Sequence, residues 1–154
     1  MKLYYQDAER YIYKISKKTS IELPFESGMK PGQVVANEYV ELEAIDSESV
    51  LITVEAGYSY DGNSGGINTE DWIIPSLYHD IFYQLIRQGL LSPSLRKQAD
   101  LCMYYLLKRS MIRGNYFARK LGSARARASY LAVRAFGAKY TKPRKIKIKK
   151  VRIY

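Results

Sequence analysis

The sequence has little of several residue types that define common classes of protein. It contains one cysteine, Cys102, among 154 residues, which excludes an internal disulfide framework and is typical of intracellular or virus-assembled proteins. It contains one histidine, His79, so neither a zinc site nor a multi-histidine metal hydrolase has enough ligands. No glycine-rich stretch is followed by the lysine of a Walker phosphate site.

Long apolar runs are also missing. No stretch approaches the roughly 20 apolar residues that a membrane-spanning helix needs, so we expect no transmembrane segment. An acidic residue, Asp7, comes too early for a secretory signal peptide, which we therefore do not expect either. The length and the apolar fraction of 47% predict one compact domain.

Acidic residues are missing from one part of the chain. Residues 101–154 carry 16 Lys and Arg and no Asp or Glu, whereas residues 1–100 carry all 15 acidic residues. Such a basic half is expected to bind nucleic acid, an anionic membrane or an acidic protein surface, the alternative being a solvated basic tail. The candidate residues for nucleic-acid or partner binding are Arg144, Lys145, Lys147, Lys149, Lys150 and Arg152. Aromatic side chains interleaved with these bases also suit a nucleic-acid accessory protein.

The order of the predicted elements indicates an α+β fold. Two β-rich runs, 39–45 and 50–54, flank a polar turn and predict an N-terminal antiparallel hairpin or small sheet. Three helices and a basic C-terminal tail are expected to follow. We divide this single compact domain into a β region over 1–56, a helical region over 57–137 and a tail over 138–154.

Proline and glycine mark the first two helices. Pro75 suits the first position of a helix, and the glycine-rich stretch from Gly57 to Gly66 predicts a loop, which is a long one if it runs to Pro75. Gly89 is expected to end this helix. Ser92 and Pro93 have the residue types of an N-cap and first position for a second helix that continues until Gly114.

The third helix is expected to start near Ser123 and to end at Gly137. The residues predicted to face the core are Ala128, Leu131 and Ala135. Residues 142–154 predict either a basic arm or an edge strand blunted by lysines.

His79 is the centre of the candidate chemistry. Imidazole is the usual general base near pH 7, and Tyr83 lies one turn later on the same helix face. Asp100, on the next helix, is placed to hold the second ring nitrogen, as in a catalytic triad with water in place of serine. Asp80 points about 100° away around the axis, and beside a glycine-rich loop it suits calcium, which prefers hard oxygen ligands. The alternative is that the His-Asp pair is a packing or capping feature without catalysis.

The order of these motifs resembles the phospholipase A2 superfamily, in particular the disulfide-free viral type of parvovirus capsid proteins. The residues that carry this resemblance are His79 to Tyr83, Gly89, Ser92-Pro93 and Ala99-Asp100. The chain also resembles a tailed-phage protein family in four motifs, Asp61 to Ser64, His79 to Tyr83, Arg96 to Asp100 and Tyr130 to Gly137. The two resemblances together cover roughly residues 57–137.

The resemblance implies a calcium-dependent lipid esterase that acts on a phospholipid or membrane surface. His79 would activate a water molecule, Asp100 would orient His79, and Tyr83 would bind Asp100. Asp80 would bind calcium together with the loop that contains Tyr60, Asp61, Gly62 and Ser64, although the acidic Asp61 departs from the family's usual calcium loop. The phage resemblance places the protein in a virion or an infected bacterial cell. There the alternative is a non-enzymatic virion or assembly component that binds other virion proteins or nucleic acid through the basic half.

Overall fold

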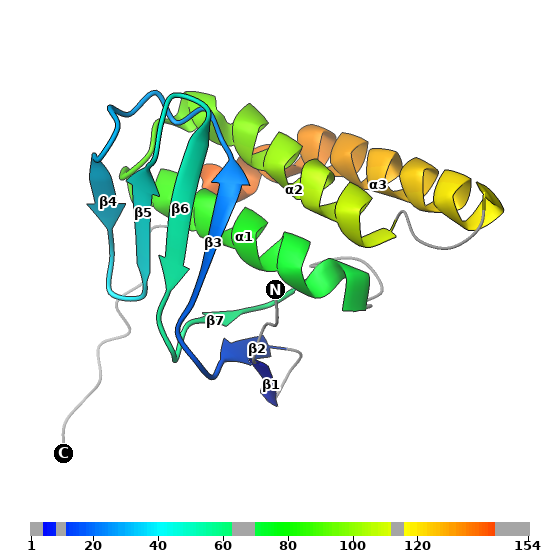
Figure 1. The fold of residues 1–154 in the computed structure, drawn as a ribbon, viewed down its shortest axis with the longest axis horizontal. Helices are drawn as coiled ribbons and strands as arrows, with labels where there is room; N and C mark the ends of the chain where they lie inside the picture. The colour runs from blue at the N-terminus through cyan, green and yellow to red at the C-terminus, as the bar shows by residue number, and fades with distance from the viewer. Residues whose placement is uncertain (1–4, 9–11, 63–69, 112–115, 144–154) are drawn as a thin grey trace, which may run out of the picture.

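The strands precede the helices along the chain, which confirms the predicted α+β fold (Figure 1). A computed structural model describes residues 5–8, 12–62, 70–111 and 116–143. Of the predicted basic tail over 138–154, residues 138–143 are described, whereas the candidate binding residues lie outside the described residues; these are Arg144, Lys145, Lys147, Lys149, Lys150 and Arg152. None of the described helices combines the length and apolar character needed to cross a bilayer.

The larger sheet has four antiparallel strands in the order β3-β6-β5-β4. Its strands are β3 (Thr19–Pro24), β4 (Val34–Ala36), β5 (Val40–Ala44) and β6 (Ser49–Val54). The predicted hairpin is formed by β5 and β6, and Asp46 closes its turn by accepting hydrogen bonds from the amides of Glu48 and Ser49 at 2.8 and 2.7 Å. Alternate residues of β6 are buried, so one face of this sheet supplies the core.

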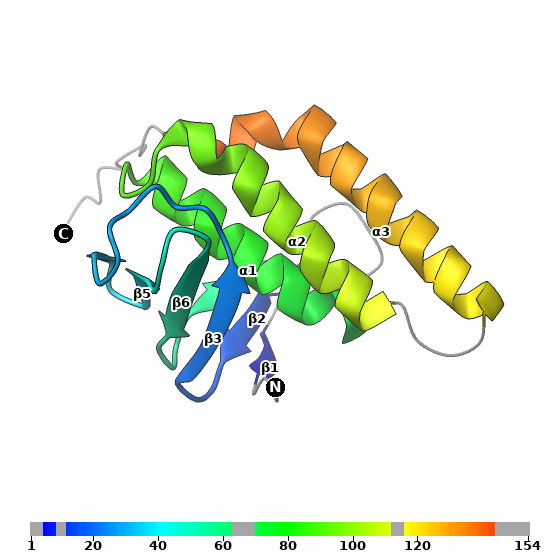
Figure 2. The same ribbon diagram turned by 45° about the horizontal axis from the view of Figure 1, so that its top comes forward.

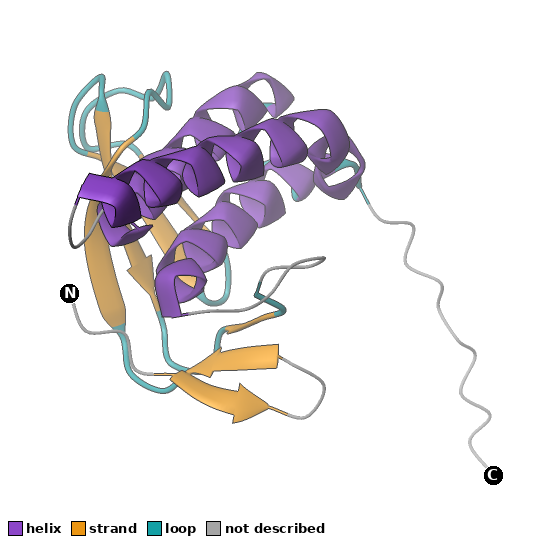
Figure 3. Cartoon of the chain, turned by 90° about the vertical axis from the view of Figure 1, so that its right-hand side faces the viewer, coloured by secondary structure: helices purple, strands orange, loops and turns teal. Residues whose placement is uncertain are grey.

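The smaller sheet has the order β1-β2-β7 and lies apart from the larger one (Figure 3). Its strands are β1 (Tyr5–Ala8), β2 (Ile12–Ile15) and β7 (Ser59–Tyr60). The prediction of an irregular loop from Gly57 to Pro75 is therefore wrong at both ends. Residues 59–60 pair with β2, and a helix has already begun at Glu70.

The helical elements are α1 (Glu70–Arg87), η1 (Pro93–Leu95), α2 (Arg96–Met111), α3 (Tyr116–Phe136) and η2 (Gly137–Thr141). Apolar residues of α1 and α2 complete the core formed by the larger sheet. A second apolar cluster lies between α2 and α3. Figure 2 shows α3 on the outside of the molecule, on the other side of α2 from the sheet.

Pro75 lies inside α1 and not at its first position. A proline cannot donate to the carbonyl four residues earlier, which here belongs to Asp71. The Ser110 hydroxyl on α2 donates to that carbonyl at 3.0 Å, so the unpaired backbone group has a partner. The helix therefore continues through the proline with support from its neighbour, which a local pattern does not reveal.

The end of α1 follows the prediction, and the predicted cap at Ser92 and Pro93 starts a short turn, η1, after which α2 begins at Arg96. Gly89 has a φ of 75°, in the left-handed region that favours glycine, and the amide of Leu90 donates to Leu85 at 2.9 Å. Ser92 accepts a hydrogen bond from the amide of Ser94 at 3.3 Å and caps η1, the short turn that leads into α2. Gly114, the predicted end of the second helix, lies outside the described residues.

The third helix differs from the prediction in both its start and its buried face. It begins at Tyr116 and not near Ser123, and it buries Gly122 and Ala126. The residues predicted to be buried, Ala128, Leu131 and Ala135, are exposed. Gly122 approaches the backbone of Met111 so closely that a β-carbon would collide with it, and this contact sets the rotation of the helix.

Candidate active site

A buried polar network joins the three helices at Asp100. The Nε2 atom of His79 lies 2.9 Å from Oδ1 of Asp100, and the Tyr83 hydroxyl donates to the same oxygen at 2.7 Å. Nη1 of Arg134 donates to Oδ2 at 2.7 Å. The structure thus brings together the three predicted catalytic residues, His79, Asp100 and Tyr83, and adds an arginine from α3.

The helices account for this arrangement. His79 and Tyr83 are one turn apart on α1, and their ring centroids are 4.1 Å apart. Because α1 and α2 are antiparallel neighbours, residue 100 faces residue 79 in the same way that residue 110 faces residue 71. Asp100 is completely buried, so its partners are protein groups.

The network determines which ring nitrogen carries the proton. Burial by itself raises the pKa of Asp100, but hydrogen bonds from His79, Arg134 and Tyr83 outweigh it and hold the pKa below its ordinary value. An ionised carboxylate only accepts, so Nε2 of His79 must carry the hydrogen. In the neutral ring, Nδ1 then keeps its lone pair, which is the atom a general base uses.

Two arginines that sequence reasoning did not assign to the site connect it to α3. Besides Arg134, the Arg96 guanidinium donates to the carbonyls of Val133 and Arg134 at 2.8 and 2.6 Å. Nε of Arg96 also donates to the Tyr83 hydroxyl at 3.2 Å. Arg96 lies four residues before Asp100 on α2, a spacing that could have indicated the pair, whereas no local signal points to Arg134.

Asp80 points away from this network, as its position on α1 predicts, and is near Asp61. Its Oδ2 atom is buried, and no described residue forms a hydrogen bond with it. Burial, followed by the negative charge of Asp61 and a hydrogen bond with Asp61, raises the pKa of Asp80 well above its ordinary value. Two neighbouring carboxyl groups with a buried oxygen that lacks a donor are favourable for a cation.

The other predicted calcium ligands are only partly described. Tyr60 is buried and its hydroxyl donates to the Ile73 carbonyl at 3.1 Å, so its side chain is already engaged. Gly62 is buried with a φ of 68°, a backbone conformation that favours glycine. Ser64 lies outside the described residues. Within the described ranges no three His, Cys, Asp or Glu side chains could hold a metal, so calcium here would need backbone carbonyl ligands as well.

Access to His79 is narrow. Its side chain is 10% exposed, and among the described residues only Asp100 forms a hydrogen bond with the ring. A reacting water molecule would therefore reach His79 only at the small part of its side chain that is exposed.

Comparisons with known proteins give this site no assigned role. No family model matches the chain, and no curated protein or solved structure matches it either.

Proposed function

We propose that the protein is a calcium-dependent lipid esterase of the phospholipase A2 type, encoded by a bacteriophage. The observation that carries the proposal is the hydrogen bond from Nε2 of His79 to a buried, ionised Asp100 on the neighbouring helix. This bond leaves Nδ1 as the basic atom of the only histidine in the sequence. The resemblance of the His79 to Tyr83 motif supplies the reaction class.

In the proposed reaction, Nδ1 of His79 takes a proton from a water molecule as the oxygen attacks the ester carbonyl. Asp100 stabilises the imidazolium that forms, and its own position is held by Tyr83 and Arg134. The imidazolium then gives the proton to the departing alcohol oxygen. The products are a fatty acid and the deacylated lipid.

The residues around Asp80 fit calcium in their chemistry. Asp80 and Asp61 would hold the ion together with carbonyl oxygens of the loop near Tyr60 and Gly62, and Ser64 is a further candidate. When bound, calcium would supply positive charge for the oxygen of the substrate carbonyl. The buried Oδ2 of Asp80, which has no donor among the described residues, supports this assignment.

The alternative is a non-enzymatic virion or assembly protein on the same scaffold. The nearly covered ring of His79 favours it, because a polar network that joins three helices also stabilises the fold without catalysis. In this case the basic half would bind partner proteins or nucleic acid.

The deciding experiment measures fatty-acid release from mixed phospholipid vesicles with calcium or with a chelator. We expect release by the wild-type chain with calcium, and a loss of at least about a hundredfold in His79→Ala. The matched control is Glu70→Gln, an exposed acid in the first turn of the same helix, which should keep full activity.

Circular dichroism first establishes that each variant is folded. The absence of release by folded wild-type protein under both conditions would exclude the esterase and leave the assembly role. Equal release by wild type and His79→Ala would exclude the proposed base.

A further inference from the structure

The outer face of α3 carries an unusual amount of exposed apolar surface. Phe117 is 80% exposed, Leu121 64% and Leu131 56%. Tyr116 at the start of the helix and Phe136 at its end are 72% and 74% exposed. The other exposed large apolar side chains among the described residues have exposed fractions of at most 47%, so the strongest exposure is concentrated on one helix. Single exposed apolar residues are normal, but a row of them indicates a binding surface.

The spacing of these residues makes one continuous stripe. The outer stripe consists of Phe117, Leu121, Ala124, Ala128, Leu131 and Ala135. Successive members are three or four residues apart, so they lie in line along one side of the helix. The opposite side contains the buried Gly122 and Ala126, which pack against α2. The helix therefore has two apolar faces, and only the inner one has a partner among the described residues.

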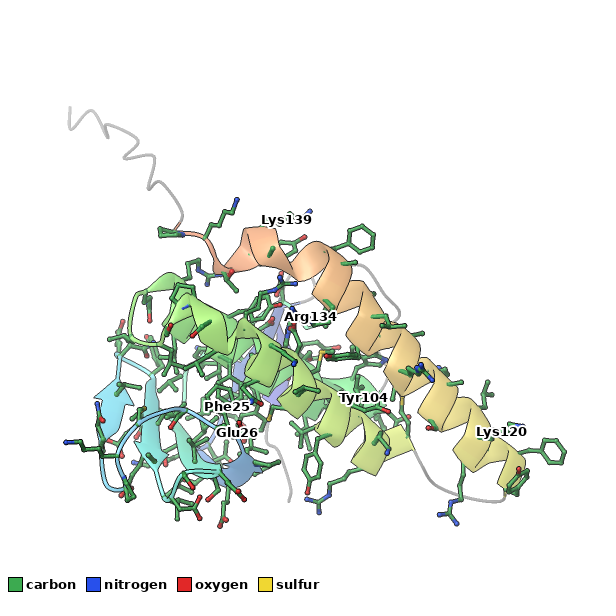
Figure 4. The ribbon with its side chains drawn as sticks, turned by 90° about the horizontal axis from the view of Figure 1, so that it is seen from above. Phe25, Glu26, Tyr104, Lys120, Arg134 and Lys139 are labelled. Carbon is green, nitrogen blue, oxygen red and sulfur yellow. The ribbon has the colours of Figure 1, made fainter. Side chains whose placement is uncertain are left out.

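Basic side chains border the outer stripe. From the helical repeat, Lys120 and Arg127 lie along one side of it and Arg125 along the other, and all three are exposed. Figure 4 shows Lys120 at the end of α3 that projects away from the rest of the molecule. Residues 101–154 contain no acidic residue, so no acid on α3 offsets these charges.

The apolar stripe and its basic borders together indicate the chemistry of the partner. A second copy of the chain would set one basic border against another, which is unfavourable. The phosphates of nucleic acid would match the bases but would leave the phenylalanine and leucine side chains without an apolar environment. An anionic bilayer accepts both, because its headgroups attract the bases and its acyl region takes up the apolar side chains. It also accepts a convex helix without a matching groove.

We infer that the outer stripe of α3 docks the protein on an anionic phospholipid bilayer. Such a bilayer is the form in which the protein would encounter its lipid substrate, and in this respect the inference rests on the proposed function. The same helix supplies Arg134 to Asp100, so the docking surface and the candidate active site belong to one packed unit.

The experiment measures sedimentation of the full chain with vesicles of phosphatidylglycerol and phosphatidylcholine, and with vesicles of phosphatidylcholine alone. It uses the His79→Ala background in a chelator, so that hydrolysis plays no part. We expect binding to the anionic vesicles, reduced at least about tenfold by the combined changes Phe117→Ser, Leu121→Ser and Leu131→Ser. The pair Lys120→Glu and Arg127→Glu should also weaken this binding.

The matched control is Val34→Ser with Ile45→Ser, which removes two exposed apolar side chains from the sheet side of the molecule and should leave binding unchanged. All substituted positions are exposed, and circular dichroism verifies the fold. Equal binding by the stripe variant and its parent would overturn the inference, because the basic tail would then suffice. A concentration-dependent dimer, or binding to duplex DNA or to an acidic protein, that depends on the stripe without vesicle binding would overturn it as well.

Vesicle binding and fatty-acid release together distinguish a failure of the docking inference from a failure of the proposed esterase. Binding that depends on the stripe, together with no fatty-acid release by wild type, would contradict the proposed esterase and support the docking surface. If wild type releases fatty acid and the stripe variant keeps both full release and full vesicle binding, the result would support the esterase and contradict the docking surface.

Discussion

Asp100 and Asp80 are carboxylates on neighbouring helices, and their surroundings differ in the supply of donors. Asp100 accepts from His79, Tyr83 and Arg134 and is fully buried. Asp80 has a buried oxygen without a partner among the described residues, and an acidic neighbour in Asp61. One carboxylate is therefore stabilised as an anion by the chain itself. The other needs a proton or a cation.

Two neighbouring helices thus support two kinds of chemistry, with Asp100 on α2 and Asp80 on α1. Hydrogen bonds and a nearby guanidinium hold the pKa of Asp100 low against its burial, so it remains a fixed acceptor for His79. The raised pKa of Asp80 means that its ionisation costs stability until a positive ion is close. Removing the carboxylate of Asp100 should therefore lower the free energy of unfolding, whereas removing that of Asp80 should raise it.

The largest effect is expected for Asp100→Ala. The change leaves Arg134, His79 and Tyr83 without their shared acceptor, and we expect a loss of about 3 kcal/mol in the free energy of unfolding. Urea denaturation measures it, with exposed Glu41→Ala as the control. A loss below about 1 kcal/mol would show that the network does not hold the three helices together.

Asp80→Asn should instead stabilise the protein without calcium at neutral pH, by about 1–2 kcal/mol, because it removes a buried carboxylate whose Oδ2 atom has no donor among the described residues. Thermal unfolding in a chelator measures this change. Calcium should raise the melting temperature of wild type and of Glu70→Gln, but not that of Asp80→Asn. A calcium effect that persists in Asp80→Asn would place the ion elsewhere.

The gain in Asp80→Asn should also depend on pH. The folded-state pKa of Asp80 is raised above its ordinary value of 3.8, so its protonated form favours folding. The contribution of the protonated Asp80 to stability is fully present below the ordinary pKa of 3.8, and it is lost as the pH rises through the raised pKa. The difference between wild type and Asp80→Asn should therefore shrink on acidification, and a constant difference would contradict the buried-carboxylate account.

Asp100 has the opposite pH dependence, and Arg134 tests it. The pKa of Asp100 is lowered, so its contribution to stability is present above its ordinary value of 3.8 and is lost as the pH falls through the lowered pKa. Arg134→Gln should raise that pKa, move acid unfolding to a higher pH and cost about 1 kcal/mol, after allowance for the partial exposure of the arginine. Arg134→Lys should cost less. An unchanged acid transition in Arg134→Gln would contradict this role.

The parts of this picture that the sequence predicts depend on short-range spacing. The hairpin follows from two β-rich runs around Asp46, and the shared face of His79 and Tyr83 follows from the helical repeat. Asp100 is within reach of His79 because the connection between the two helices is short. These relations involve residues on one element or on adjacent elements.

The parts that the sequence does not predict depend on tertiary contacts. Arg134 lies 34 residues beyond Asp100, and its role requires the position of α3. That position depends on Gly122 against the backbone of Met111, whereas hydrophobic spacing alone favours burying Leu131. The outer stripe has the spacing of a buried helix face, but the contact at Gly122 turns the opposite side of α3 toward α2. The stripe therefore remains exposed.

The smallest expected effect concerns Gly137, directly after α3. A β-carbon at this position would collide with the Tyr83 hydroxyl, which is held by Asp100 and Arg96. Gly137→Ala should therefore cost about 1 kcal/mol by displacing the tyrosine. In a Tyr83→Phe background the hydroxyl is absent, so the same change should cost less by about 0.5 kcal/mol or more. Urea denaturation of the four chains gives this coupling, with exposed Ala138→Ser as the control. Strict additivity would mean that Gly137 does not support the tyrosine that positions Asp100.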